Sequence, residues 1–351
     1  MKPAKRLALI GTAVASVAMA AFFLSWLVAT ARPEATEVAH TPVTAAPVST
    51  GDIALATTPT PQPIATPLAV PVARPQAAVP ATVLLRHVDT DALFLRSSAA
   101  LVLDENEDVV LYGRNIDEQR PIASLTKLMT ALVMLEAGLA LDEQIEITRA
   151  DRDRLKGSKS RLRYGTILRR DDMLHVALAA SDNRAAAALA RTYPGGPSAL
   201  IAAMDAKARE LGLAHTHFAD AAGLRAENVS TARDLAKLAR MIRQYPQIDA
   251  WSVSPRLQVT NRRTGNEIRF GNTNRLVYRD SWEISLSKTG YTAEAGNCLL
   301  MRAVIAERPV IIVLLNSWGK LSKYGDSHRI RKWLLDTEHK IEVLVAASGN
   351  I

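Results

Sequence analysis

The sequence predicts an α+β domain that follows a long segment of different composition. Strand-like runs stand at both ends of the region after residue 82, helical patterns fill its middle, and one more helical pattern comes near the C-terminus. Strands at both ends favour an antiparallel sheet that joins the two ends of the region, with helices packed against it. With 351 residues, of which 48% are hydrophobic and 22% charged, the chain is not a wholly disordered or fibrous protein.

Residues 1–31 are typical of a targeting segment. Three basic side chains near the N-terminus precede an uncharged stretch, residues 7–31. A secretory signal has an apolar region of about 7–15 residues and a membrane span needs about 20, so this length favours an uncleaved anchor. Residues 29–31 (Ala-Thr-Ala) nevertheless suit a signal peptidase, and a cleaved signal remains the alternative. Under either alternative the basic residues stay inside and the rest is exported.

Residues 32–82 predict a disordered linker. Ten of the 17 prolines lie between Pro33 and Pro80, and the segment contains no aromatic residue. Such a composition buries too little apolar surface to offset the entropy of ordering. In a polyproline conformation of about 3.1 Å per residue, the linker would reach on the order of 150 Å.

Residues 83–351 predict one domain, whose elements follow in order. Residues 98–103 and 109–112 flank a polar turn and predict a hairpin. Residues 122–137 are apolar nearly all round, which is typical of a buried helix. Further helices are expected at 172–180, 183–191, 197–211 and 231–244, the last one capped by Thr231. Strands are expected at 284–288, 298–305 and 310–315, and a closing helix near 327–335.

A serine and a lysine open the expected buried helix. Ser124 and Lys127 are three residues apart, so they lie on one helix face. A partly desolvated lysine can lose its proton and activate the serine hydroxyl, while the helix N-terminus offers N–H groups to an oxyanion. Alone the pattern is weak, because it recurs at residues 285–288 and 317–320.

Two further motifs make the serine–lysine pattern specific. Ser181-Asp182-Asn183 follows Ser124 by 57 residues, and Lys288-Thr289-Gly290 follows it by 164. The ordered trio S-x-x-K, S-D-N and K-T-G is the signature of penicillin-binding proteins and class A β-lactamases. The chain resembles the low-molecular-mass penicillin-binding proteins, which are serine D-Ala-D-Ala peptidases. Residues 158–162, residues 193–196 and the acidic Asp182 are most similar to the D-alanyl-D-alanine endopeptidase subgroup.

The resemblance implies a β-lactamase/transpeptidase-like fold, an antiparallel sheet flanked by helices with a helical subdomain. It also implies that Ser124 is the nucleophile and Lys127 the general base. Ser181 would relay the proton to the leaving amine, and the N–H groups of Ser124 and Tyr291 would form the oxyanion hole. The implied catalytic set is Ser124, Lys127, Ser181, Asn183 and Lys288, and the implied substrate-binding set is Thr289, Gly290 and Tyr291.

The implied function is hydrolysis of peptidoglycan cross-links by a periplasmic serine endopeptidase, through an acyl-enzyme. A DD-carboxypeptidase that removes terminal D-Ala is the alternative, and a non-catalytic wall-binding or β-lactam-sensing module is the alternative of another class. A class A β-lactamase is disfavoured, because no E-x-x-L-N stretch follows Asn183. The expected partners are peptidoglycan stem peptides, β-lactams as covalent inhibitors, and the inner membrane through residues 7–31 if they are uncleaved. We expect no cofactor, metal or nucleic acid.

Three remaining features favour structural roles. The net charge is +8, and residues 149–170 hold nine basic side chains against two acidic ones, which predicts a solvated face or an attraction to acidic wall polymer. His215 and His217 could share one strand face, but no third metal ligand is recognisable nearby. Cys298, the single cysteine, excludes a disulfide framework and is expected to be a small buried residue.

Overall fold

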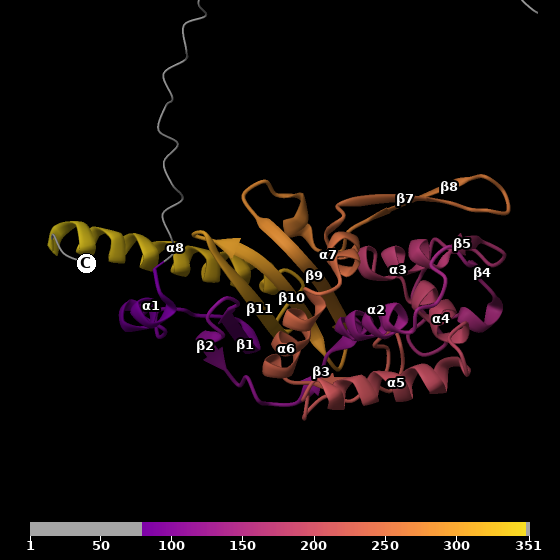
Figure 1. The fold of residues 1–351 in the computed structure, drawn as a ribbon, viewed down its shortest axis with the longest axis horizontal. Helices are drawn as coiled ribbons and strands as arrows, with labels where there is room; N and C mark the ends of the chain where they lie inside the picture. The colour runs from indigo at the N-terminus through magenta and orange to yellow at the C-terminus, as the bar shows by residue number, and fades with distance from the viewer. Residues whose placement is uncertain (1–78, 349–351) are drawn as a thin grey trace, which may run out of the picture. The chain divides into compact units, whose positions relative to one another are not determined.

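A computed structural model describes residues 79–348 of the chain. Its centre is a five-stranded sheet with the strand order β2-β1-β11-β10-β9, in which all neighbours are antiparallel (Figure 1). The N-terminal hairpin therefore pairs with the C-terminal strands, as the sequence predicted. The strands are β1 (Ser97–Asp104), β2 (Val109–Arg114), β9 (Glu283–Thr292), β10 (Gly296–Ile305) and β11 (Arg308–Ser317).

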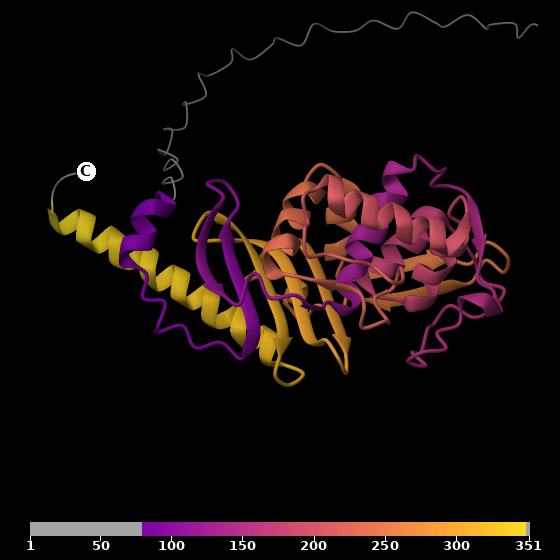
Figure 2. The ribbon, with the colours of Figure 1, turned by 90° about the horizontal axis from the view of Figure 1, so that it is seen from below.

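The sheet is buried on both faces, and successive apolar residues of β1, β10 and β11 enter different cores. On β1, Leu101 packs with the helical subdomain, whereas Val102 packs with the C-terminal helix. Figure 2 shows the sheet between these two layers. One layer is α1 (Ala81–His87) and α8 (Ser322–Ser348), and the other contains α6 (Ala232–Ile242) and the subdomain.

The helical subdomain surrounds the helix that carries the first motif. Every residue of α2 (Thr126–Glu136) from Thr126 to Met134 is buried, which explains why its sequence is apolar nearly all round. The other helices are α3 (Arg170–Ala179), α4 (Asn183–Arg191), α5 (Gly196–Glu210) and α7 (Pro246–Val253), with short 3-10 turns η1 (Ala123–Leu125), η2 (Arg149–Asp151) and η3 (Arg275–Tyr278). Three two-stranded ribbons complete it: β3 (Arg120–Pro121) with β6 (Val229–Ser230), β4 (Gln144–Glu146) with β5 (Ile167–Arg169), and β7 (Arg256–Thr260) with β8 (Glu267–Gly271).

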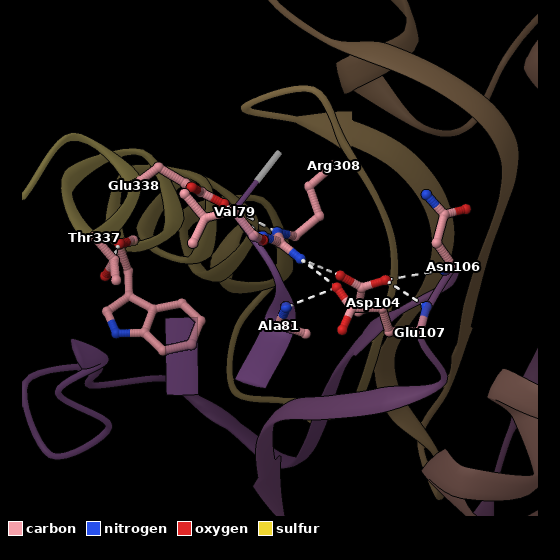
Figure 3. A network of polar contacts seen from close by, with 9 residues as sticks. Val79, Ala81, Asp104, Asn106, Glu107, Arg308, Thr337 and Glu338 are labelled. Atoms are coloured by element: carbon pink, nitrogen blue, oxygen red, sulfur yellow. Dashed lines mark hydrogen bonds and ion pairs between the residues drawn. The ribbon is translucent and has the colours of Figure 1, made fainter. Parts of the chain in front are cut away.

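A buried arginine joins both ends of the described chain. Arg308, which is 2% exposed, bonds the carbonyl of Val79 and the carboxylate of Asp104, and its Nη2 donates to Glu338 Oε1 at 2.8 Å (Figure 3). The N–H of Ala81 donates to Glu107 Oε1 at 2.7 Å, so α1 is held against the β1–β2 turn (Figure 3). A cation that makes several bonds to buried carboxylates offsets its desolvation cost.

The predicted elements are confirmed to within a few residues, and Thr231 does cap α6 by accepting from the N–H of Asp234 at 3.0 Å. The closing helix, expected at 327–335, extends over 27 residues. The prediction of a solvated basic face is wrong for Arg170, which is 1% exposed and pairs with Glu143. Arg170 is buried because it occupies the first turn of α3, where its Nε donates to the Ala140 carbonyl in the loop before β4.

The predicted targeting segment (1–31) and nearly all of the predicted linker lie outside the described residues. Helix α1 begins at Ala81, so the last two residues of the segment predicted as linker are helical. Within residues 79–348, no helix combines the length and the apolar character that a bilayer crossing requires.

Candidate active site

Ser124 lies in a strained turn that leads into α2. Ala123 in front of it has a φ of 48°, a region that non-glycine residues rarely adopt. Gly223 approaches the same turn so closely that a Cβ on it would lie 1.9 Å from the Ala123 carbonyl oxygen. Only glycine therefore fits at position 223, where φ is +77°. The turn is packed on one side by this loop, which fixes where the Ser124 hydroxyl points.

Lys127 is buried, and its ammonium group contacts three oxygens. Nζ donates to Ser124 Oγ at 2.8 Å, to Asn183 Oδ1 at 2.7 Å and to the carbonyl of Ala222 at 2.7 Å. Burial lowers the pKa of Lys127 to about 7, although the charges of Asp220, Asp182 and Asp153 oppose the shift. A lysine with this pKa is partly neutral near pH 7 and can accept the proton of the hydroxyl beside it.

The second motif lies between α3 and α4. Ser181 has a φ of 56°, and Asp182 caps α4 by accepting from the N–H groups of Arg184 and Ala185 at 2.9 and 3.1 Å. Asp182 lies directly before Asn183, the first residue of α4, and this position directs the Asn183 amide to Lys127. Among the described residues, no hydrogen bond joins the Ser181 hydroxyl to another group.

The third motif lies on the free edge of the sheet, because β9 is an edge strand. A Cβ on Gly290 would lie 2.9 Å from the Ile122 carbonyl oxygen and 3.1 Å from Ser124 N, so glycine lets the strand edge approach the serine turn. Lys288 is buried, and burial together with the charges of Lys127 and Lys323 lowers its pKa well below the usual value.

Of the remaining two residues of the edge, Thr289 is buried and Tyr291 is exposed. Thr289 Oγ1 donates to Thr273 Oγ1 at 2.7 Å, and the side chain of Tyr291 is 67% exposed. Hydrogen bonds thus join Ser124, Lys127 and Asn183 directly, and close approach places Gly290 beside Ser124.

Four site residues have no motif in the sequence. The Ala222 carbonyl accepts from Lys127, and Ser158 Oγ accepts from Asn183 Nδ2 at 2.9 Å. Thr273 bonds Thr289, and Lys323 adds positive charge near Lys288. Ser158 was indicated only through the resemblance of its segment, and the other three are brought to the site by long-range folding.

The residues expected to be structural stay outside this chemistry. Cys298 is fully buried, and burial raises its pKa to about 11, which keeps the thiol protonated. His217 Nδ1 lies 3.0 Å from Asp205 Oδ2, and its backbone forms a β-bridge with Val229. Within the described part of the chain, no three histidine, cysteine or carboxylate side chains are grouped as metal ligands.

The geometry combines a hydroxyl, a buried lysine of lowered pKa and an open strand edge, which suits acyl transfer to Ser124. A family model described as D-alanyl-D-alanine carboxypeptidase matches residues 87–319. The chain belongs to this family. It is therefore a serine hydrolase, as its motifs predicted.

Individual relatives carry a different activity in their names from that of the family model. A D-alanyl-D-alanine endopeptidase of Pseudomonas aeruginosa is 47% identical over 240 residues, which cover 68% of this chain and 77% of the relative. One of Escherichia coli is 45% identical with the same coverage. The crystal structure of penicillin-binding protein D2 from Listeria monocytogenes, in an ampicillin-bound form, is 28% identical, covers 69% of this chain and 98% of its own, and superposes with a TM-score of 0.60. The predicted penicillin-binding fold is confirmed.

Proposed function

We propose that this enzyme is a serine endopeptidase that hydrolyses D-alanyl cross-links between peptidoglycan stem peptides. The observation that carries the proposal is the 2.8 Å contact between Lys127 Nζ and Ser124 Oγ, in a site open along β9. Its relatives at 45–47% identity are named endopeptidases, which supports cleavage within a cross-link rather than at a chain end.

In the proposed first step, neutral Lys127 takes the proton of Ser124 as Oγ attacks the D-alanyl carbonyl. The oxyanion forms between the N–H groups of Ser124 and Tyr291, close to the point where Gly290 meets the serine turn. The amide C–N bond then breaks, and Ser181 passes a proton to the leaving amine. Water hydrolyses the Ser124 ester in the second step.

Substrate orientation is assigned to the strand edge. An extended peptide can add to β9 as a further antiparallel strand, with its backbone paired to the edge. The Asn183 amide would hold the substrate backbone as well as Lys127. The carboxylate of the leaving residue would meet the Thr289 hydroxyl and the Lys288 amino group. Its negative charge would favour the protonated form of Lys288, against the burial that lowers the pKa of this lysine.

We further propose that the domain works in the periplasm, with residues 7–31 as an inner-membrane anchor or a cleaved signal, and residues 32–82 as a linker. The basic flank and the apolar stretch support export, and the proline content supports the linker. β-Lactams would acylate Ser124 covalently, which the ampicillin-bound relative supports.

The test uses purified cross-linked muropeptide dimers and pentapeptide monomers. The endopeptidase releases monomers from dimers and leaves the pentapeptide's terminal residue in place, whereas a carboxypeptidase removes that residue. Ser124→Ala is expected to abolish both hydrolysis and covalent labelling by a fluorescent penicillin, and a Ser124→Ala variant that still labels would contradict the assigned nucleophile. Stable labelling of the wild type without any muropeptide product would favour a non-catalytic sensor.

A further inference from the structure

A cavity of about 790 Å³ adjoins the candidate site at the end of the sheet where β9 ends. It lies among the β9–β10 turn, the segment after β11 and the first turn of α8. Thr273 and Tyr291 line it, and both belong to the wall of the site: Thr273 bonds Thr289, and Tyr291 directly follows Gly290. The cavity is therefore a continuation of the site and not a separate pocket.

The cavity is positively charged. Arg275, Lys320 and Lys323 line it, and none of the three forms an ion pair with a carboxylate in the part of the chain that the structure describes. Lys323 is buried and donates to Asn297 Oδ1 at 3.1 Å, whereas Arg275 and Lys320 are exposed. A further cation, Arg96, lies over the Trp318 ring at 5.8 Å, whereas Lys156 is paired with Glu294 of the β9–β10 turn. Unpaired cations along one cavity favour an anionic ligand.

The same cavity is lined by large apolar side chains that are exposed to solvent. Trp318 is 76% exposed, Tyr291 67% and Leu321 55%, and all three line it. Aromatic side chains beside cations are typical of surfaces that bind peptides, because aromatic rings offer large contact areas at a low entropic cost. Charge and apolar area together fit an acidic peptide better than a simple inorganic anion.

Building on the proposed function, we propose that this cavity binds the leaving stem peptide, the half of the cross-link that is released with a free amine. When the amide C–N bond breaks, the acyl half stays on Ser124 Oγ and the amine takes the proton passed from the serine hydroxyl. The carboxylate of the leaving residue lies at Thr289, so any chain attached to that residue continues past Thr289 and Tyr291 into the cavity.

This arrangement makes Trp318 and Lys320 specificity-determining residues. A terminal D-Ala has nothing beyond its carboxylate and does not reach the cavity, whereas the leaving half of a cross-link is a whole peptide that carries further carboxylates. Contacts to Trp318 and Lys320 therefore stabilise only the cross-linked substrate, and they should act on its kcat/KM alone.

The experiment compares Lys320→Glu and Trp318→Ala with the wild-type full chain on three substrates: a cross-linked muropeptide dimer, a pentapeptide monomer and a fluorescent penicillin. We expect each variant to lower kcat/KM for the dimer about tenfold, the factor for one lost charge-assisted or buried aromatic contact. Reaction with the other two substrates should stay within about twofold. Lys320→Arg keeps the charge and should retain dimer cleavage.

The matched control is Lys340→Ala. Lys340 is an exposed lysine on α8, about 25 Å along the helix from Lys323 in its first turn. It should change none of the three reactions. Unchanged dimer cleavage in Lys320→Glu and Trp318→Ala, or equal losses on all three substrates, would overturn the assignment of the cavity. A wild-type enzyme that labels with penicillin but releases no monomer from the dimer would instead overturn the proposed endopeptidase itself.

Discussion

The lowered pKa of Lys127 predicts how acylation depends on pH. Burial holds this pKa at about 7, against an ordinary value of 10.5. If neutral Lys127 takes the proton of Ser124, the rate follows the neutral fraction of the lysine. About half of the molecules are neutral at pH 7, about 10% at pH 6 and about 1% at pH 5. The second-order rate constant for penicillin acylation should therefore fall about tenfold for each unit below pH ~6.

The assay measures labelling by a fluorescent penicillin from about pH 5 to pH 9, where the profile should rise to a plateau. Asp153→Asn supplies an internal test, because the Asp153 charge raises the Lys127 pKa and its loss should move the midpoint to lower pH. Asparagine keeps the oxygen that accepts from the N–H of Leu155. A flat profile, or a midpoint near the ordinary lysine value, would refute the assignment of Lys127 as the base.

The same shift has a consequence for stability, and its sign is fixed. Folded Lys127 loses its proton near pH 7, whereas the unfolded chain keeps that proton up to about pH 10.5. Between these values the unfolded state binds more protons, so the free energy of unfolding rises with pH across this window. The lowered pKa of Lys288 acts in the same direction. Chemical denaturation at about pH 7 and pH 9 measures the difference.

Three further predictions concern single positions. Gly290→Ala should lower penicillin acylation by at least about a hundredfold, because the Cβ forces β9 away from Ser124 and a small displacement of reacting groups is costly. Ser181→Ala should abolish turnover without changing Tm, whereas Asp182→Ala should also lower stability by about 1 kcal/mol through loss of the α4 cap, as thermal melts will show. Arg308→Met should lower the free energy of unfolding by about 3–5 kcal/mol, measured in urea, because buried carboxylates lose their partner.

Each of these has an outcome that contradicts it. Full acylation in the Gly290→Ala protein would mean that the strand edge does not hold the substrate beside the serine. A Tm loss in Ser181→Ala equal to that in Asp182→Ala would assign Ser181 a structural role. Unchanged urea stability in Arg308→Met would show that the buried ion cluster contributes nothing net. The control for Arg308→Met is Lys332→Ala, which removes the exposed ion pair between Lys332 and Asp336 on α8.

Much of the site could be predicted because its chemistry lies in short motifs at element boundaries. The contacts of Lys127 with Ser124 and Asn183 follow the pattern that the motifs implied. Thr273 and Lys323 could not be found this way, since ordinary sequence surrounds them and only tertiary packing brings them to β9. The positive φ angles at Ala123 and Ser181 could not be predicted either, because neither residue type indicates such a conformation.

The fold was predicted best where burial on all sides produces a long, continuous apolar run. The central strands and α2 are buried on all sides and read plainly from their apolar runs. The ribbon of β7 and β8 was not predicted, although exposed and more buried residues alternate along both strands, because each strand is only five residues long. Helix α8 was underestimated, because most side chains of its second half are exposed, apolar Val343 and Leu344 among them, and no apolar stripe of helical period marks it.

The left-handed turns at Ala123 and Ser181 bear on how this enzyme can evolve. A residue with a side chain pays about 1 kcal/mol in that conformation, and glycine or asparagine adopts it more readily. Selection for heat resistance alone would therefore enrich such replacements at both turns. Replacing Ser181 removes a proposed catalytic hydroxyl, and replacing Ala123 loosens the turn that aims Ser124. Laboratory lineages selected for heat resistance without an activity screen should gain thermal stability and lose activity through replacements at these two positions first.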